Sequence, residues 1–120
     1  MELYSEIYRT VECENLAVCM GSGDLPVLAT PQMIAWMEEA SCLIAKTEPG
    51  WTTVGISMDV SHDAPSALKA EIRIQSRLAE QKGKIYTFEV SAYDGEKCIG
   101  KGIHKRCAVN REKFMAKFNG

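Results

Sequence analysis

Four consecutive segments in the second half of the chain alternate apolar and polar residues, and this pattern restricts the fold more than any other feature. The segments cover residues 54–60, 68–78, 86–92 and 99–109. Alternation with a period of two is typical of strands that bury one face. Lys82-Gly83-Lys84 and Asp94-Gly95 fit tight turns, and such turns join antiparallel neighbours. The sequence therefore predicts four consecutive antiparallel strands.

One amphipathic helix precedes these strands. The apolar residues that recur at three- and four-residue steps are Met33, Met37, Ala40 and Ile44. Thr30-Pro31 marks the start of the helix, because threonine is a good N-cap and proline fits the first turn. We expect about four turns that end near Lys46. Residues 6–11 and 16–20 are expected to supply a leading strand or two, and residues 111–118 a short terminal helix.

One helix on an antiparallel sheet is an α+β architecture. A sheet wrapped around one long central helix is the hotdog fold, and the pattern supports this layout without separating it from other α+β folds that have one helix. With 120 residues, the chain is expected to form a single domain over residues 1–120.

Composition and charge argue against several other classes of protein. The formal net charge is −2 and the basic residues are spread along the chain, so no nucleic-acid surface is expected. No apolar run approaches a membrane span, and the N-terminus lacks the features of a signal peptide. Five scattered cysteines with only two histidines argue against a metal site, and no cofactor is expected. Reduced thiols favour a cytoplasmic location.

Three stretches of the chain resemble the hotdog thioesterases of the fluoroacetyl-CoA thioesterase type. They are Gly21 to Pro31 with Met33 and Trp36 to Ala40, Val54 to His62, and Ser91 to Arg106. The resemblance covers nearly the whole chain after the first dozen residues. It implies a hydrolase that cleaves an acyl-CoA thioester. It also implies a homodimer whose two sites lie at the subunit interface, with a dimer of dimers as an alternative assembly.

The resemblance also implies a set of site residues. In this family the catalytic groups are a threonine before the helix, a glutamate within it and a histidine at the end of the next strand, and a glycine offers its backbone N–H to the thioester oxygen. The matching residues are Thr30, Glu38, His62 and Gly55. The fluoroacetyl-CoA enzyme has phenylalanines in the loop before its threonine, whereas residues 21–27 contain no aromatic side chain. We therefore expect another short or medium acyl group.

Three of these residues have a chemical role and a plain structural alternative. Thioester hydrolysis needs a base, a nucleophile or activated water, and donors for the oxyanion. Glu38 borders the apolar side of the helix, where it is a candidate base or nucleophile, or else a solvated glutamate. His62 points inward and either relays protons or bonds to a loop carbonyl. Gly55 either admits a ligand close to the backbone or packs against the helix.

Thr30 is explained equally well by helix capping. In a regular helix, Thr30 and Glu38 differ by about 12 Å along the axis, so one straight helix does not bring both to one carbonyl. Either the chain bends near Thr30, or the two residues that act together come from two subunits. We hypothesise that two subunits share the site.

Two further interpretations concern the last strands and the class of function. His104 has the opposite parity from the apolar residues of its strand, which predicts a structural or surface position. Cations on outward strand faces are candidates for CoA phosphates, although a solvated face is the simpler interpretation: Lys69, Arg73, Arg77, Lys101, Lys105 and Arg106. The alternative function is a hotdog protein that binds acyl-CoA or another apolar ligand without turnover, because fold does not fix function.

Overall fold

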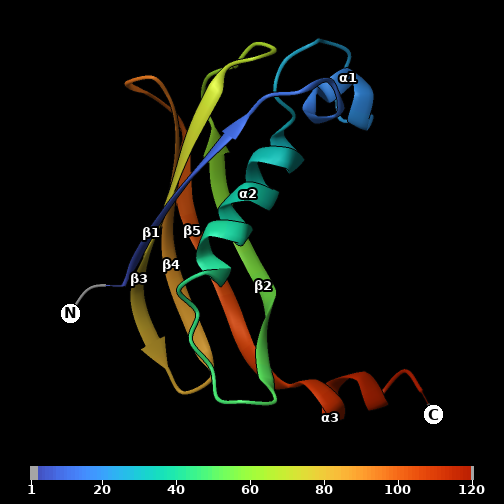
Figure 1. Cartoon of the computed structure of the whole chain (residues 1–120), viewed down its shortest axis with the longest axis vertical. Helices are drawn as coiled ribbons and strands as arrows, with labels where there is room; N and C mark the ends of the chain where they lie inside the picture. The colour runs from blue at the N-terminus through green and yellow to red at the C-terminus, as the bar shows by residue number, and fades with distance from the viewer. Residues whose placement is uncertain (1–2, 120) are drawn as a thin grey trace.

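The computed structural model describes residues 3–119, which form an antiparallel sheet and a long helix packed on it (Figure 1). In chain order the elements are β1 (Tyr4–Thr10), the 3₁₀ turn η1 (Cys13–Asn15), α1 (Ala17–Met20), α2 (Thr30–Cys42), β2 (Trp51–His62), β3 (Glu71–Lys82), β4 (Ile85–Asp94), β5 (Lys97–Asn110) and α3 (Arg111–Ala116). This arrangement confirms the predicted α+β class.

The strands lie in the order β1-β3-β4-β5-β2, and each neighbouring pair is antiparallel. The turns after β3 and β4 are tight, as predicted. Gly83 and Gly95 take the left-handed φ values of 60° and 64° that such turns favour. The expectation of four sequential neighbours is wrong for β2, which pairs with β5 rather than β3. The connection formed by residues 63–70 is too long for a tight turn. It carries the chain from β2 at one edge of the sheet to β3, which lies next to the strand at the opposite edge.

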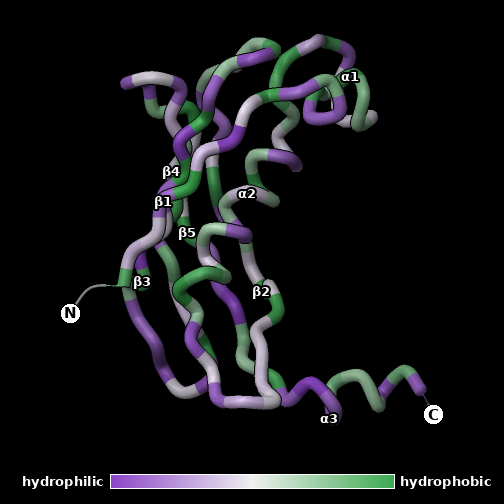
Figure 2. The backbone as a smooth tube through the Cα atoms, viewed as in Figure 1, coloured by the Kyte–Doolittle hydropathy of each residue, from purple (hydrophilic) through white to green (hydrophobic). Residues whose placement is uncertain are grey.

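The core lies between α2 and one face of the sheet. Its buried side chains include Met33, Trp36, Met37 and Ala40 from α2 and Ile72, Ile74, Phe88, Val90 and Ile99 from the strands. Apolar and polar residues alternate along the strands in Figure 2, which is the pattern that one buried face requires. The predicted apolar side of the helix is confirmed. Phe88 is fully buried, and truncating a phenylalanine in such a place costs about 3–5 kcal/mol.

Three element boundaries differ from the expectations. Residues 16–20 do not form a strand; Ala17–Met20 form helix α1, which Gly21 ends with a φ of 78°. Helix α2 ends at Cys42 rather than near Lys46. Strand β3 begins at Glu71 rather than at residue 68, because Lys69 has a φ of 75° that breaks the extended conformation.

Two bulges decide which residues of β2 and β5 face α2. The register of β2 against β5 shifts between Gly55 and Ser57, so Ile56 is an extra residue. The register of β5 against β4 shifts in the same way around Ile99. A bulge reverses the alternation beyond it. Gly55 and His62 therefore face the helix together, although they are seven positions apart.

Within residues 3–119, no helix combines the length and the apolar character needed to cross a bilayer.

Candidate active site

Thr30 and His62 form a direct contact at the start of α2. The N-cap of the helix is Ala29, which has no side-chain capping bond, so Thr30 is the first helical residue and does not act as the cap. Its Oγ1 lies 2.7 Å from Nδ1 of His62, the last residue of β2. The capping explanation for Thr30 is therefore wrong. The hydroxyl is held by an imidazole instead.

Burial is the main influence on the His62 ring. It lowers the pKa of His62 below the ordinary value of 6.5, and the Asp63 carboxylate and a backbone bond at Ala64 oppose this shift. The ring is thus neutral near pH 7 and able to take up a proton. Its Nε2 is buried and has no hydrogen-bond partner within residues 3–119. A buried ring nitrogen without a partner is uncommon and calls for a functional explanation.

A cavity of about 370 Å³ lies beside this pair. Thr30 and His62 line it, together with the loop before α2 and the residues after β2: Ala17, Ser22, Gly23, Asp24, Leu25, Val27, Leu28, Asp63, Ala64 and Pro65. None of these side chains is a phenylalanine, tyrosine or tryptophan. The cavity walls are therefore small aliphatic and polar groups.

Glu38 lies in a second cluster, two turns further along α2. Its Oε2 is 3.3 Å from a guanidinium nitrogen of Arg106, and 41% of its side chain is exposed. The carboxylate also lies against Gly55. A Cβ atom at residue 55 would come within 2.7 Å of Glu38 Oε2. The glycine thus leaves room for the carboxylate over strand β2.

Arg106 and His104 belong to this cluster. The outward face predicted for Arg106 is wrong, and for His104 the surface alternative is wrong while the structural alternative fits. Arg106 is 7% exposed and His104 is 1% exposed, so neither lies on an outward face. The cause is the bulge at Ile99. It puts Ile99 in the core and turns residues 100, 102, 104 and 106 toward α2. Ile103, expected inside, is 38% exposed.

A network of hydrogen bonds fixes these two side chains. Arg106 donates through Nε to Thr53 Oγ1 at 2.8 Å and through a terminal nitrogen to the Thr53 carbonyl at 3.1 Å. Its other terminal nitrogen lies 3.2 Å from His104 Nε2. A guanidinium only donates, so Nε2 accepts, and the proton is on Nδ1, which donates to the Ser57 carbonyl at 2.9 Å. Burial, reinforced by Arg106, lowers the pKa of His104.

The sequence contained one signal for this pair. Gly100 and Gly102 interrupt the alternation of the last strand, and glycine inside a strand often marks a bulge. A bulge at that point turns His104 and Arg106 inward.

The described chain therefore brings the predicted residues together in two pairs. Thr30 lies with His62, and Glu38 lies with Gly55. The eight positions between Thr30 and Glu38 correspond to about 12 Å of helix. Along β2, Gly55 and His62 are separated by roughly 20 Å.

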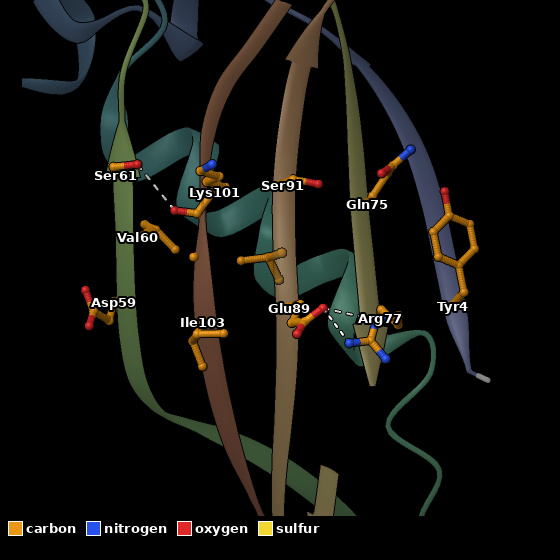
Figure 3. Close-up of a pocket in the computed structure, with 12 residues that line it drawn as sticks. Tyr4, Asp59, Val60, Ser61, Gln75, Arg77, Glu89, Ser91, Lys101 and Ile103 are labelled. Carbon is orange, nitrogen blue, oxygen red and sulfur yellow. Dashed lines mark hydrogen bonds and ion pairs between the residues drawn. The ribbon is translucent and has the colours of Figure 1, made fainter. Parts of the chain in front are cut away.

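A larger cavity of about 710 Å³ lies on the opposite face of the sheet (Figure 3). Its lining includes Tyr4, Asp59, Gln75 and Ile103, together with Arg77 and Lys101, two of the candidate cations for CoA phosphates. Thr30, Glu38, Gly55 and His62 do not line it. Arg77 there pairs with Glu89 at 2.5 Å. Within residues 3–119, no three His, Cys, Asp or Glu side chains gather so as to hold a metal ion.

Comparisons with known proteins identify the family of the chain. A model of the fluoroacetyl-CoA-specific thioesterase family matches residues 11–112. The fluoroacetyl-CoA thioesterase of Streptantibioticus cattleyicolor is 35% identical over 94 residues, which are 76% of this chain and 67% of that protein.

Solved structures give the same result. The structure of the fluoroacetyl-CoA thioesterase FlK has a TM-score of 0.90 at 26% identity and covers 99% of this chain and 94% of its own. A hot-dog-like protein from Thermanaerovibrio acidaminovorans has a TM-score of 0.88 at 15% identity over 97% of this chain and 87% of its own, which supports the fold alone. The family match over residues 11–112 and the shared architecture show that this chain belongs to the fluoroacetyl-CoA-specific thioesterase family and has the hotdog fold.

Proposed function

We propose that this chain is a cytoplasmic, single-domain homodimer that hydrolyses the thioester of a short or medium acyl-CoA. Family membership supports the reaction class. The observation that carries the site assignment is the 2.7 Å contact between Thr30 Oγ1 and His62 Nδ1, which both line the 370 Å³ cavity. Five free cysteines agree with a reducing compartment.

Each residue is assigned the role that the family resemblance implies, and its surroundings support that role. The backbone N–H of Gly55 binds the thioester oxygen as negative charge develops on it. Glu38 removes a proton from the attacking water, or attacks the carbonyl itself to form an anhydride that water then hydrolyses. The C–S bond breaks, and the CoA sulfur leaves with a proton. His62, neutral before the reaction, takes up and returns a proton, and Thr30 holds its ring.

A site shared by two protomers reconciles these roles with the distances. Glu38 and His62 lie in different clusters of one chain, whereas β2 is an edge strand with β5 as its neighbour. An edge strand of this length is a template for pairing with a second copy, and Ile56 on it is 51% exposed. Antiparallel pairing of two β2 strands brings Glu38 of one protomer toward His62 of the other.

The cavity beside Thr30 supports an acyl group other than fluoroacetyl. Its loop wall, residues 21–27, has no aromatic ring to close over a small fluorinated group. An open pocket with aliphatic and polar walls accepts a longer chain.

The test of the reaction is thiol release from a panel of acyl-CoA esters. We expect release that falls at least about 100-fold in Glu38→Gln and in His62→Ala, the loss typical of a missing acid–base group. Glu39→Gln is the matched control, because Glu39 is the next helix residue and pairs with Arg9. Release that survives both substitutions would refute the site assignment. Acyl-CoA binding without release would favour the alternative of a non-catalytic binding protein.

The test of the shared site is subunit mixing. In a heterodimer of Thr30→Ala and Glu38→Ala protomers, one of the two shared sites keeps both residues. We therefore expect about half of the wild-type activity per heterodimer, while each homodimeric variant is inactive. No recovery in purified heterodimers would show that each site uses one chain.

A further inference from the structure

A basic groove lies at the end of the sheet where β2 begins and β5 ends. Its volume is about 330 Å³. The lining residues come from both strands, from the turn after β3 and from α3: Trp51, Lys84, Cys107, Ala108, Val109, Asn110, Lys113, Phe114 and Lys117. A neighbouring hollow of about 220 Å³ shares Trp51, Lys84 and Ala108 with it.

The charged side chains that line this groove are all basic. Three exposed lysines line it, and no aspartate or glutamate does. Within residues 3–119, none of the three lysines forms an ion pair with a carboxylate. By contrast, Lys69 pairs with Glu12, and Arg73 lies 3.8 Å from Glu6. In a chain with a net charge of −2, the groove is a local site for anions.

Aromatic rings lie among these lysines. The Lys84 ammonium is 5.2 Å from the centre of the Trp51 ring, and the Lys117 ammonium is 5.2 Å from the centre of the Phe114 ring. A flat ring next to an ammonium group suits a ligand that has both a base and phosphates, because bases stack on aromatic faces. A simple anion would not need the rings.

The groove lies within reach of Gly55. Trp51 is four residues before Gly55 on the same strand, so the two lie about 13 Å apart. Alternate residues of a strand share a face, which places Trp51, Thr53 and Gly55 on one line. The long pantetheine arm of CoA separates its sulfur from its nucleotide. We propose that this groove, defined by Trp51, Lys84, Lys113, Phe114 and Lys117, binds the 3′-phosphorylated ADP end of CoA; this rests on the function proposed above.

Steady-state kinetics with two substrates test the proposal. The variant is Lys113→Ala/Lys117→Ala, and the matched control is Lys82→Ala/Lys97→Ala, which removes the same charge from two exposed lysines that do not line the groove. We expect the KM for an acyl-CoA to rise about tenfold in the groove variant, with kcat unchanged. Kinetics on the same acyl group carried by N-acetylcysteamine, which lacks the nucleotide, should not change. The KM effect should shrink as salt is added.

Binding of adenosine 3′,5′-bisphosphate gives a readout without catalysis. We expect it to quench tryptophan fluorescence in the wild type and not in Trp51→Phe, because Trp36 is buried in the core. An unchanged KM for acyl-CoA in an active groove variant would overturn the proposal, as would an equal change on the N-acetylcysteamine ester. A defect confined to acyl groups on a carrier protein would also overturn it. If the wild type hydrolysed no acyl-CoA, the proposed function would fail, while nucleotide binding would still test the groove.

Discussion

Replacing Gly55 by alanine should lower the rate of catalysis strongly while it changes the stability of the fold only slightly. The new Cβ would lie 2.7 Å from Glu38 Oε2 and 3.4 Å from both an Arg106 nitrogen and His104 Cε1. The first distance is too short, so the Glu38 carboxylate must move. The other two are tight, but they require adjustments of only a few tenths of an ångström.

The cost to stability is small. Gly55 does not have a positive φ, so alanine fits the backbone and stabilises the fold by about 0.4–1 kcal/mol through the unfolded state. Moving the end of a flexible glutamate off its preferred rotamer costs about 0.5–1.5 kcal/mol. The two effects nearly cancel, so we expect Tm to stay within about 5 °C of the wild type. Catalysis loses a positioned carboxylate, and kcat/KM should fall about 100-fold, or about 2.7 kcal/mol.

Thermal denaturation and thiol release on the same samples measure both quantities. A double variant with Glu38→Gln adds a control. Both changes act on the same group, the Glu38 carboxylate, so Gly55→Ala should lower kcat/KM by less than about a further twofold in the Glu38→Gln background. Independent 100-fold losses would mean that the glycine acts apart from the carboxylate. A near-normal kcat/KM, or a Tm lowered by more than about 10 °C, would refute the steric reasoning.

Three other predictions follow from the two clusters. Because burial lowers the pKa values of His62 and His104, the unfolded chain takes up protons first. The contribution of the two histidines to the free energy of unfolding should therefore be complete above about pH 6.5 and decrease at lower pH. Urea denaturation at several pH values measures this, and a free energy of unfolding that did not change with pH would contradict it. Arg106→Met should lower the free energy of unfolding by about 1–3 kcal/mol, whereas Lys105→Met on the exposed face should change it by less than about 0.5 kcal/mol in the same urea assay. Thr30→Ser should keep most of kcat/KM and Thr30→Val should lose about 100-fold, so equal rates for the two would exclude a role for the hydroxyl.

Local periodicity was enough to predict most of the fold. The apolar steps from Met33 to Ala40 predicted the buried side of α2, and the alternation from residue 71 to residue 78 predicted β3. These patterns are local because each strand or helix must bury one side. The place of β2 was not predictable in this way, since pairing with β5 depends on contacts between residues far apart in the sequence.

The candidate site was predictable in part. The motifs located Thr30 and His62, but capping was an adequate local explanation for the threonine until its contact with the imidazole was seen. Arg106 and His104 were misplaced because their parity depends on the bulge at Ile99. A bulge is a property of two paired strands, so counting along one strand gave the wrong face.

The extra residue at Ile56 makes the strand more tolerant of shortening than of lengthening. Gly55 and His62 are an odd number of positions apart, and a strictly regular strand would send them to opposite sides. A chain without Ile56 would have an even spacing and would keep both on the helix side with no irregularity. A second inserted residue would turn Met58, Val60 and His62 outward and empty that part of the interior.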